Sequence, residues 1–431
     1  MSPLLPATES ALLRSLAEVQ AQSRQPSVVA GLVRDGSLVW TDYRGQSSGP
    51  DMQYRIGSIT KTFTAVAVLQ CRDDGLLELD DPLGSHLGDG VPFASAPVRR
   101  LLSHSAGLPA EPEGPWWERH EGGDFAALSA AVAGQPQVHA VGERFHYTNL
   151  GYGLLGELVS RLRGRSWINA VSERVLEPLG MTRTTYGPTA LHAQGYSVHP
   201  YAGTLDEEPH TDTGAMAPAG QLWSTVEDLA RYAGFWIAGG DAAVLAPSSV
   251  TEMCTPAAGE PGAVTPSVYG LGVQLFARAD RTLIGHGGSM PGFLAGFVVD
   301  STRRTAGIAM SNGTAGSTPM LASTLVDTIE ELEPPLPTEW VPEPIVLGAD
   351  ELLGLWYWGN TPMTFAVRSG HLVIDHVVPG RRTRLVREVA DVWRCLDHYY
   401  AGELLRVVRA DDGAVSHLDL ITYRLTRAAY A

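Results

Sequence analysis

A segment rich in proline and glutamate divides the chain into two unequal parts. Residues 330–344 contain five prolines and five glutamates. Because proline fixes φ and has no backbone N–H to donate, such a stretch interrupts regular structure and is typical of an extended, solvated linker. The sequence therefore predicts one domain at residues 1–333, a linker at 334–345 and a second domain at 346–431.

The first part mixes helical and strand patterns. Residues 27–34 and 37–45 are predicted to pair as a β-hairpin, because Asp35-Gly36 between them is a strong two-residue turn. Helices are predicted at 1–25, 60–74, from 149 onward, 225–237 and 320–332, and strands at 269–276, 281–285, 292–300 and 305–312. Terminal helices on an antiparallel sheet, with a helical insertion between the sheet's halves, predict an α/β sandwich.

The second part contains short runs of Val, Leu, Tyr and Trp separated by turns. Two of the turns are predicted at residues 368–370 and 411–413. This pattern is typical of a small all-β domain, either a barrel or a curled sheet.

Composition narrows the classes of partner. The net charge of −16 argues against nucleic acid or an anionic membrane surface as a partner. No apolar run reaches the length of a membrane span, and the N-terminal segment lacks an export signal, so we expect a cytoplasmic protein. The cysteines at 71, 254 and 395 fit neither a zinc spacing nor a disulfide framework, and we expect buried thiols and no cofactor.

Lys61 is the only lysine in a chain of 431 residues. An ammonium group can lose its proton near neutral pH when it is buried, whereas a guanidinium cannot, so a single retained lysine indicates a position where deprotonation matters. Lys61 follows Ser58 by three residues at the predicted start of a helix, where positions i and i+3 share a face. The spacing predicts a serine nucleophile with a lysine base, although a surface lysine with a chance serine nearby is the alternative.

Tyr147 and Asn149 lie just before the predicted helix that starts near residue 149. A phenol can relay protons and an Asn amide can bind a substrate carbonyl. The alternative is structural: Asn149 would be an N-cap and Tyr147 a packing residue.

A glycine-rich stretch, 285–289, lies between two predicted strands. Consecutive glycines such as Gly287 and Gly288 indicate close approach of a ligand to the backbone. The N–H of Ser289 could pair with that of Ser58 as an oxyanion hole, and His286 could bind Tyr147 or the substrate. A bulge or a tight connection between strands is the alternative.

These three elements resemble, in order and spacing, the serine β-lactamase and penicillin-binding-protein superfamily, in the branch near class C β-lactamases. That branch also holds D-aminopeptidases, D,D-carboxypeptidases, esterases and acyltransferases. The resemblance covers the chain from about residue 9 to about residue 333, and segments 101–108, 177–181 and 214–220 look like the same branch and are interpreted as structural.

The resemblance implies an enzyme in which Ser58 is acylated, Lys61 is its base and Tyr147 relays protons. It implies that Asn149 binds a substrate amide and that the N–H groups of Ser58 and Ser289 form the oxyanion hole. The departure is His286, which stands where related β-lactamases have a lysine. Because a neutral histidine is a weaker carboxylate anchor, we expect a peptide or ester substrate ahead of a β-lactam.

The second domain resembles lipocalin-like modules of cytoplasmic relatives, among them penicillin-binding-protein-type thioesterases that cyclise peptides. A peptidyl substrate delivered as a thioester, or a D-stereospecific peptidase activity, is therefore expected beside the alternatives of a carboxylesterase, a weak β-lactamase and a catalytically silent sensor domain. Arg427, or less favourably Arg424, is predicted to hold a substrate carboxylate. Trp116, Trp117 and Trp223 either line an acyl pocket or belong to the core.

Overall fold

The chain forms two units, Met1–Pro335 and Leu336–Ala431, and the boundary falls within the proline- and glutamate-rich segment. The computed structural model describes residues 4–46, 49, 51–259, 268–278, 280–337, 339–376 and 381–430. Each unit is described by itself below. None of the helices in the described residues is both long and apolar enough to span a bilayer.

Within the described residues, the α-helices all belong to the first unit. They are α1 (Pro6–Gln22), α2 (Thr60–Asp73), α3 (Gly84–Leu87), α4 (Val98–Leu102), α5 (Phe125–Ala131), α6 (Asn149–Arg163), α7 (Trp167–Val171), α8 (Ala217–Gly220), α9 (Val226–Ile237), α10 (Pro247–Met253) and α11 (Thr318–Leu332). The strands of this unit are β1 (Ser27–Arg34), β2 (Ser37–Gly45), β3 (Tyr54–Arg55), β4 (Tyr196–Val198), β5 (Leu205–Glu207), β6 (Trp223–Ser224), β7 (Ala258–Gly259), β8 (Val268–Tyr269), β9 (Gln274–Ala277), β10 (Thr282–Met290), β11 (Phe293–Asp300) and β12 (Thr305–Ser311).

One antiparallel sheet, ordered β2-β1-β12-β11-β10-β9-β8-β7, forms the centre of the first unit. Alternate residues of β1 enter two different cores. Val28 packs with α1 and α11 on one face, whereas Val29 packs with α2 and α9 on the other. Since both faces are covered, nearly all of β1 is buried. This confirms the predicted α/β sandwich.

The hairpin between β1 and β2 turns at Asp35 and Gly36, as predicted. Their φ values are 52° and 78°. Positive φ at both central residues is typical of the type I′ turn, whose twist matches that of the two strands. This requirement explains why Asp-Gly is used there. Arg34 pairs with Ser37 directly across the turn.

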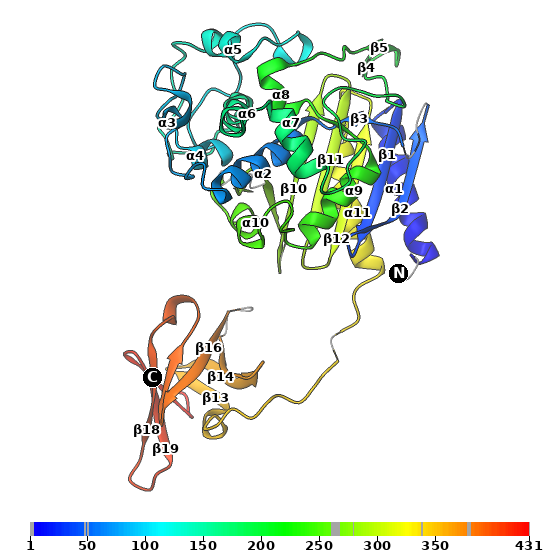
Figure 1. Ribbon diagram of the computed structural model, residues 1–431. Helices are drawn as coiled ribbons and strands as arrows, with labels where there is room; N and C mark the ends of the chain where they lie inside the picture. The colour runs from blue at the N-terminus through cyan, green and yellow to red at the C-terminus, as the bar shows by residue number, and fades with distance from the viewer. Residues whose placement is uncertain are drawn as a thin grey trace. The chain divides into compact units, whose positions relative to one another are not determined.

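Helices α2 to α10 are inserted in the chain between β2 and β7. Among them α9 packs against β1 and β12 of the sheet, whereas α3 to α6 form a helical part that lies beside the sheet (Figure 1). Helices α2, α6 and α8 pack on one another. A 3₁₀ turn, Gly57–Ile59, leads into α2 and lies against β10 and β11. Ser58, which lies in this turn, is therefore at the junction between the helical part and the sheet.

Two strand predictions are corrected. The segment 269–276 is not one strand, because Gly272 adopts φ 83° between β8 and β9. Strand β10 does not end at residue 285 but continues to Met290, so His286 and the glycines after it lie within a strand and not in a connection. Glycine has low strand propensity, which is why the pattern ended too early.

The second unit is a closed barrel, as the sequence allowed. Its strands are β13 (Gly354–Trp358), β14 (Thr361–Arg368), β15 (His371–Asp375), β16 (Arg382–Val389), β17 (Val392–Cys395), β18 (Leu404–Arg409), β19 (Val415–Leu420) and β20 (Tyr423–Thr426). Trp356, Phe365 and Trp393 are fully buried in its core. Closure leaves no free sheet edge among these strands.

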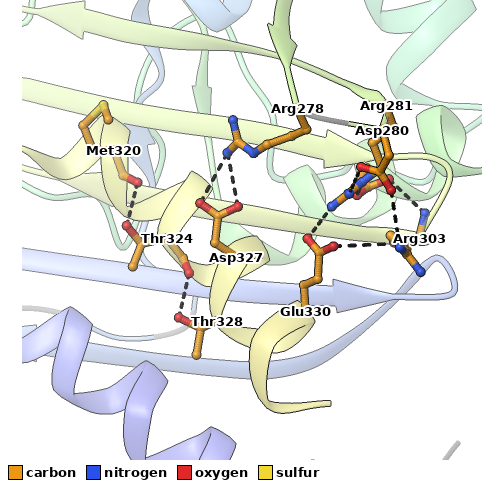
Figure 2. Close-up of polar contacts among 10 residues, drawn as sticks. Arg278, Asp280, Arg281, Arg303, Met320, Thr324, Asp327, Thr328 and Glu330 are labelled. Carbon is orange, nitrogen blue, oxygen red and sulfur yellow. Dashed lines mark hydrogen bonds and ion pairs between the residues drawn. The ribbon is translucent and has the colours of Figure 1, made fainter. Parts of the chain in front are cut away.

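An ion-pair network fastens α11 to the sheet (Figure 2). Arg281 lies between Asp300, whose carboxylate oxygen is 2.5 Å from Nε, and Glu330 of α11. The Asp300 side chain is fully buried and that of Arg281 is 7% exposed. Arg278 pairs with Asp327, which lies about one helical turn before Glu330 in α11, but the side chains of Arg278 and Asp327 are both substantially exposed.

Replacing Arg281 with alanine is expected to lower the free energy of unfolding of this unit by about 3–5 kcal/mol. The reason is that Asp300 would be left as a buried, unpaired charge. The matched control Arg278→Ala breaks an exposed pair and is expected to cost under about 1 kcal/mol. Urea unfolding of the full chain measures both, and equal losses for the two variants would contradict the assignment.

Candidate active site

Ser58 and Lys61 come together at the start of α2. Ser58 lies in the 3₁₀ turn, and Lys61 is the second residue of the helix. The Lys61 Nζ lies 2.9 Å from the Ser58 Oγ and donates a 2.7 Å hydrogen bond to the carbonyl oxygen of Ala219 in α8. In the neutral amine, one N–H can keep the Ala219 bond while the lone pair accepts the Ser58 proton. The segment 214–220, interpreted from sequence as structural, therefore positions the base.

Burial suits Lys61 to accept a proton. Its side chain is 0% exposed. Desolvation is the main cause that lowers the pKa of Lys61 to about 7, and the carboxylates of Glu111 and Glu118 oppose the shift. At neutral pH a large fraction of this amine is free of its extra proton.

Tyr147 lies over the same amine, whose Nζ is 5.1 Å from the centre of the phenol ring. Burial raises the pKa of Tyr147 above its usual value, and a hydrogen bond with the Ser58 side chain works in the opposite direction. The phenol thus keeps its proton at neutral pH and can donate it. Of the two groups beside Ser58, Lys61 is the one suited to act as base.

His104 supports Tyr147, a role that sequence analysis missed. The imidazole stacks on the phenol with ring centres 4.2 Å apart. It is fully buried, its Nδ1 accepts a 3.1 Å bond from the Thr148 backbone N–H, and burial lowers its pKa well below the usual value. Its position in a loop, within a segment interpreted as structural, gave no signal of this contact.

Asn149 is the first residue of α6, and Thr148, not Asn149, is the N-cap: its side-chain oxygen accepts the Gly151 N–H. The interpretation of Asn149 as an N-cap is therefore wrong, and substrate binding by Asn149 stays a prediction. The Asn149 side chain is half-buried and donates a 2.6 Å bond to Glu111. Glu111 also accepts a 2.7 Å bond from the indole of Trp117. This network fixes the orientation of the Asn149 amide.

The glycines of β10 bring the backbone of Ser289 against the 3₁₀ turn. A Cβ on Gly57, whose φ is 52°, would lie 2.5 Å from the Ser289 nitrogen. A Cβ on Gly288 would lie 2.0 Å from the carbonyl oxygen of Ile56. The close approach at Gly288 thus involves the chain's own backbone and not a ligand, and it juxtaposes the segments that carry Ser58 and Ser289.

A pocket of about 380 Å³ opens over these groups. Its lining includes Ser58, Tyr147, His286, Gly288 and Ser289. The structure thus brings together Ser58, Lys61, Tyr147, His286, Gly288 and Ser289. Asn149 is not among the lining residues of this pocket, and its side-chain amide is bonded to Glu111.

Two acidic residues near Lys61 also escaped sequence analysis. Glu118 accepts a 2.7 Å bond from the Trp116 indole, and burial raises the pKa of its carboxyl group. Of the tryptophans considered for an acyl pocket, Trp223 belongs to the core, whereas Trp116 is 52% exposed. Glu111 lies in a loop and Glu118 in a single 3₁₀ turn, Trp117–Arg119. Neither segment has a sequence periodicity, so the proximity of the two residues to Lys61 was not predictable.

Arg427 has partners of its own in the barrel. Its guanidinium donates to the carbonyl oxygens of Leu353, Leu355 and Glu351 and lies 3.9 Å from the centre of the Trp356 ring. It follows β20 and is not part of that strand. These contacts give it a structural role, and carboxylate binding by Arg427 stays a prediction. The Nε of Arg424 lies 3.6 Å from the Oδ1 of Asp419.

The cysteines are unpaired, as expected. Cys71 and Cys395 are buried, Cys254 is partly buried, and burial raises the pKa of each thiol. Within the described part of the chain, no group of three or more His, Cys, Asp or Glu side chains is arranged to hold a metal ion.

Comparisons with known proteins match both units. Residues 12–327 match the family model described as Beta-lactamase. Residues 348–427 match a domain of unknown function, DUF7586. Beta-lactamase-like protein 2 of Dictyostelium discoideum is 30% identical over 236 residues, which are 49% of this chain and 42% of that protein. The chain spans about half the length of the curated relatives it matches first.

Three of the similar solved structures match nearly the whole chain. SurE is 25% identical with a TM-score of 0.63, and the match covers 98% of this chain and 99% of SurE. The octameric penicillin-binding protein homologue from Pyrococcus abyssi is 24% identical with a TM-score of 0.67, over 97% of this chain and 99% of that one. A second structure shows SurE with D-Leu, at 25% identity, a TM-score of 0.61 and coverage of 98% and 100%.

Proposed function

Because the chain belongs to the beta-lactamase family, a family of hydrolases with this fold, we propose that it is a serine acyl hydrolase or acyltransferase working through an acyl-Ser58 intermediate. The observation that carries the proposal is the buried Lys61 amine, with a pKa of about 7, placed 2.9 Å from the Ser58 Oγ. A permanently charged or exposed lysine could not remove the serine proton at neutral pH.

The proposed reaction has two steps. In the first, Ser58 Oγ forms a bond to the acyl carbon while Lys61 takes the hydroxyl proton, and the bond to the leaving group breaks as Tyr147 supplies a proton to it. The backbone N–H groups of Ser58 and Ser289 stabilise the negative charge on the acyl oxygen. In the second step, water or an amine attacks the acyl-Ser58 carbon and gives a proton to the Tyr147 phenolate. The bond between the acyl carbon and Ser58 Oγ then breaks, and Lys61 returns its proton to Oγ, which restores all three side chains.

The proposed substrate is an ester or thioester, and the acyl group that it transfers to Ser58 is a peptidyl or amino-acyl group. Similarity to SurE extends over both units of the chain, and SurE has been solved with a D-amino acid. That likeness favours an acyl group with a D-configured terminal residue and an amine as an alternative acceptor to water. A simple carboxylesterase, a weak β-lactamase and a silent binding domain remain the competing assignments.

The proposal is tested by intact-mass analysis and initial rates. Wild-type protein is expected to gain one acyl group from a p-nitrophenyl ester, and Ser58→Ala is expected to gain none. N-acetyl-D-leucyl thioesters should react faster than the L-isomers, and a chromogenic cephalosporin should turn over slowly. Adding a primary amine should divert product from acid to amide.

Each competing assignment has its own outcome. No acylation of the wild type by any ester would support a silent domain and would refute the proposal. Equal use of D- and L-isomers with rapid acetate hydrolysis would indicate a carboxylesterase. Rapid cephalosporin turnover would indicate a β-lactamase.

A further inference from the structure

His286 lies in the wall of the pocket that contains Ser58. It is in the middle of β10, opposite Phe297 of β11, and is only 3% exposed. The ring is 6.2 Å from that of Tyr147, measured between centres. A side chain at this place can contact a substrate bound at Ser58.

The hydrogen bond at Nδ1 fixes which tautomer His286 adopts. Nδ1 lies 2.5 Å from the carbonyl oxygen of Gly287, and since a carbonyl oxygen only accepts, Nδ1 carries a hydrogen. Burial, with a smaller effect of the neighbouring Lys61, lowers the pKa of His286 to about 3. The ring is therefore neutral at physiological pH, and the other nitrogen, Nε2, presents a lone pair.

Nε2 of His286 is buried and has no hydrogen-bond partner among the described residues. A buried acceptor without a donor costs about 1–3 kcal/mol, so a ligand that supplies a donor is favoured. Sites with buried polar groups discriminate strongly against ligands that leave those groups unpaired.

We propose that His286 determines specificity: Nε2 accepts a hydrogen bond from an N–H or O–H of the substrate, so that the pocket takes an amide, amine or alcohol group there and rejects a carboxylate. This inference rests on the proposed acylation of Ser58. A carboxylate has no hydrogen to give, and its oxygens would face the lone pair of Nε2.

The rest of the pocket supplies no counter-charge for a carboxylate. Its described lining contains neither arginine nor lysine. Lys61 lies beneath it, with Nζ engaged by Ser58 and by the Ala219 carbonyl. The side-chain oxygen of Gln274, another residue of the wall, is an acceptor and is bonded to the Gly287 N–H.

The test uses two esters with the same N-acetyl-D-leucyl group, one of lactate and one of lactamide. They differ only in whether the leaving alcohol carries a carboxylate or a neutral carboxamide. With full-length wild-type protein, kcat/KM is expected to favour the lactamide ester by about tenfold or more, the size of one hydrogen bond to a buried group. His286→Lys should reverse the preference, and His286→Leu should reduce it toward equality.

The outcomes separate this inference from the proposed function. If the wild type is acylated by a p-nitrophenyl ester but uses the lactate ester as well as or better than the lactamide ester, the inference about His286 is wrong and the acyl-enzyme proposal stands. An unchanged ratio in a folded His286→Lys or His286→Leu variant also overturns it. Failure of the wild type to form any acyl-Ser58 overturns both. The wild-type ratio decides even where a variant does not fold.

Discussion

Lys61→Arg is expected to slow acylation of Ser58 by about 10²- to 10⁴-fold, the usual contribution of a general base. Arginine keeps its proton at every accessible pH, so it cannot accept the proton of the Ser58 hydroxyl. The rate of acylation by a p-nitrophenyl ester, followed by intact mass, measures the loss. Lys61→Met is the matched control, since it retains an unbranched chain in the buried site and removes the base without adding a charge.

The wild-type pH profile tests the same assignment without a mutation. Burial lowers the pKa of Lys61 to about 7, and only the neutral amine can act as base. Acylation should therefore rise as pH increases through about 7 and level off above it. A folded Lys61→Arg variant that acylates as fast as the wild type, or a wild-type rate that is flat from pH 5 to about pH 9, would contradict the role of Lys61.

Local signals explain which parts of the fold were predictable. The Asp35-Gly36 turn and the start of α2 depend on residues close in sequence, and the structure has both where they were predicted. The pairing of Ser58 with Lys61 is also local, since it needs only the spacing of one helical turn. Chemistry that one element can carry was therefore visible in the sequence.

The parts that failed depend on contacts between distant segments. His104 reaches Tyr147 from 43 positions earlier in the chain, and Ala219 reaches Lys61 from 158 positions later. Neither residue type is chemically unusual, and the Ala219 contact uses only a backbone carbonyl. The full length of β10 was also not predicted. Its glycines have low strand propensity, and Gly288 is needed there because the strand packs closely against the backbone of Ile56, which lies far away in the sequence.

Gly288→Ala is expected to reduce acylation by about 10²- to 10³-fold, comparable to loss of one donor from an oxyanion hole. The new Cβ would lie 2.0 Å from the Ile56 carbonyl oxygen and 2.9 Å from its carbon, and both are backbone atoms that cannot rotate away. Strand β10 must then move from the 3₁₀ turn, which separates the N–H groups of Ser58 and Ser289. Acylation by a p-nitrophenyl ester is the measurement, with the melting temperature as a check that the variant folds.

Gly287→Ala is the matched control for this prediction, because it adds the same methyl group one residue away. Its Cβ would meet only the Pro319 side chain, at 3.8 Å, which is an ordinary van der Waals contact. The control should keep most of its acylation rate, while Gly288→Ala should not. Equal rates in two folded variants would show that the approach of β10 to the 3₁₀ turn does not set the geometry of the oxyanion hole. A selective loss in Gly288→Ala would instead show that this glycine contributes to catalysis by having no side chain, which lets two backbone donors from distant segments meet at one acyl oxygen.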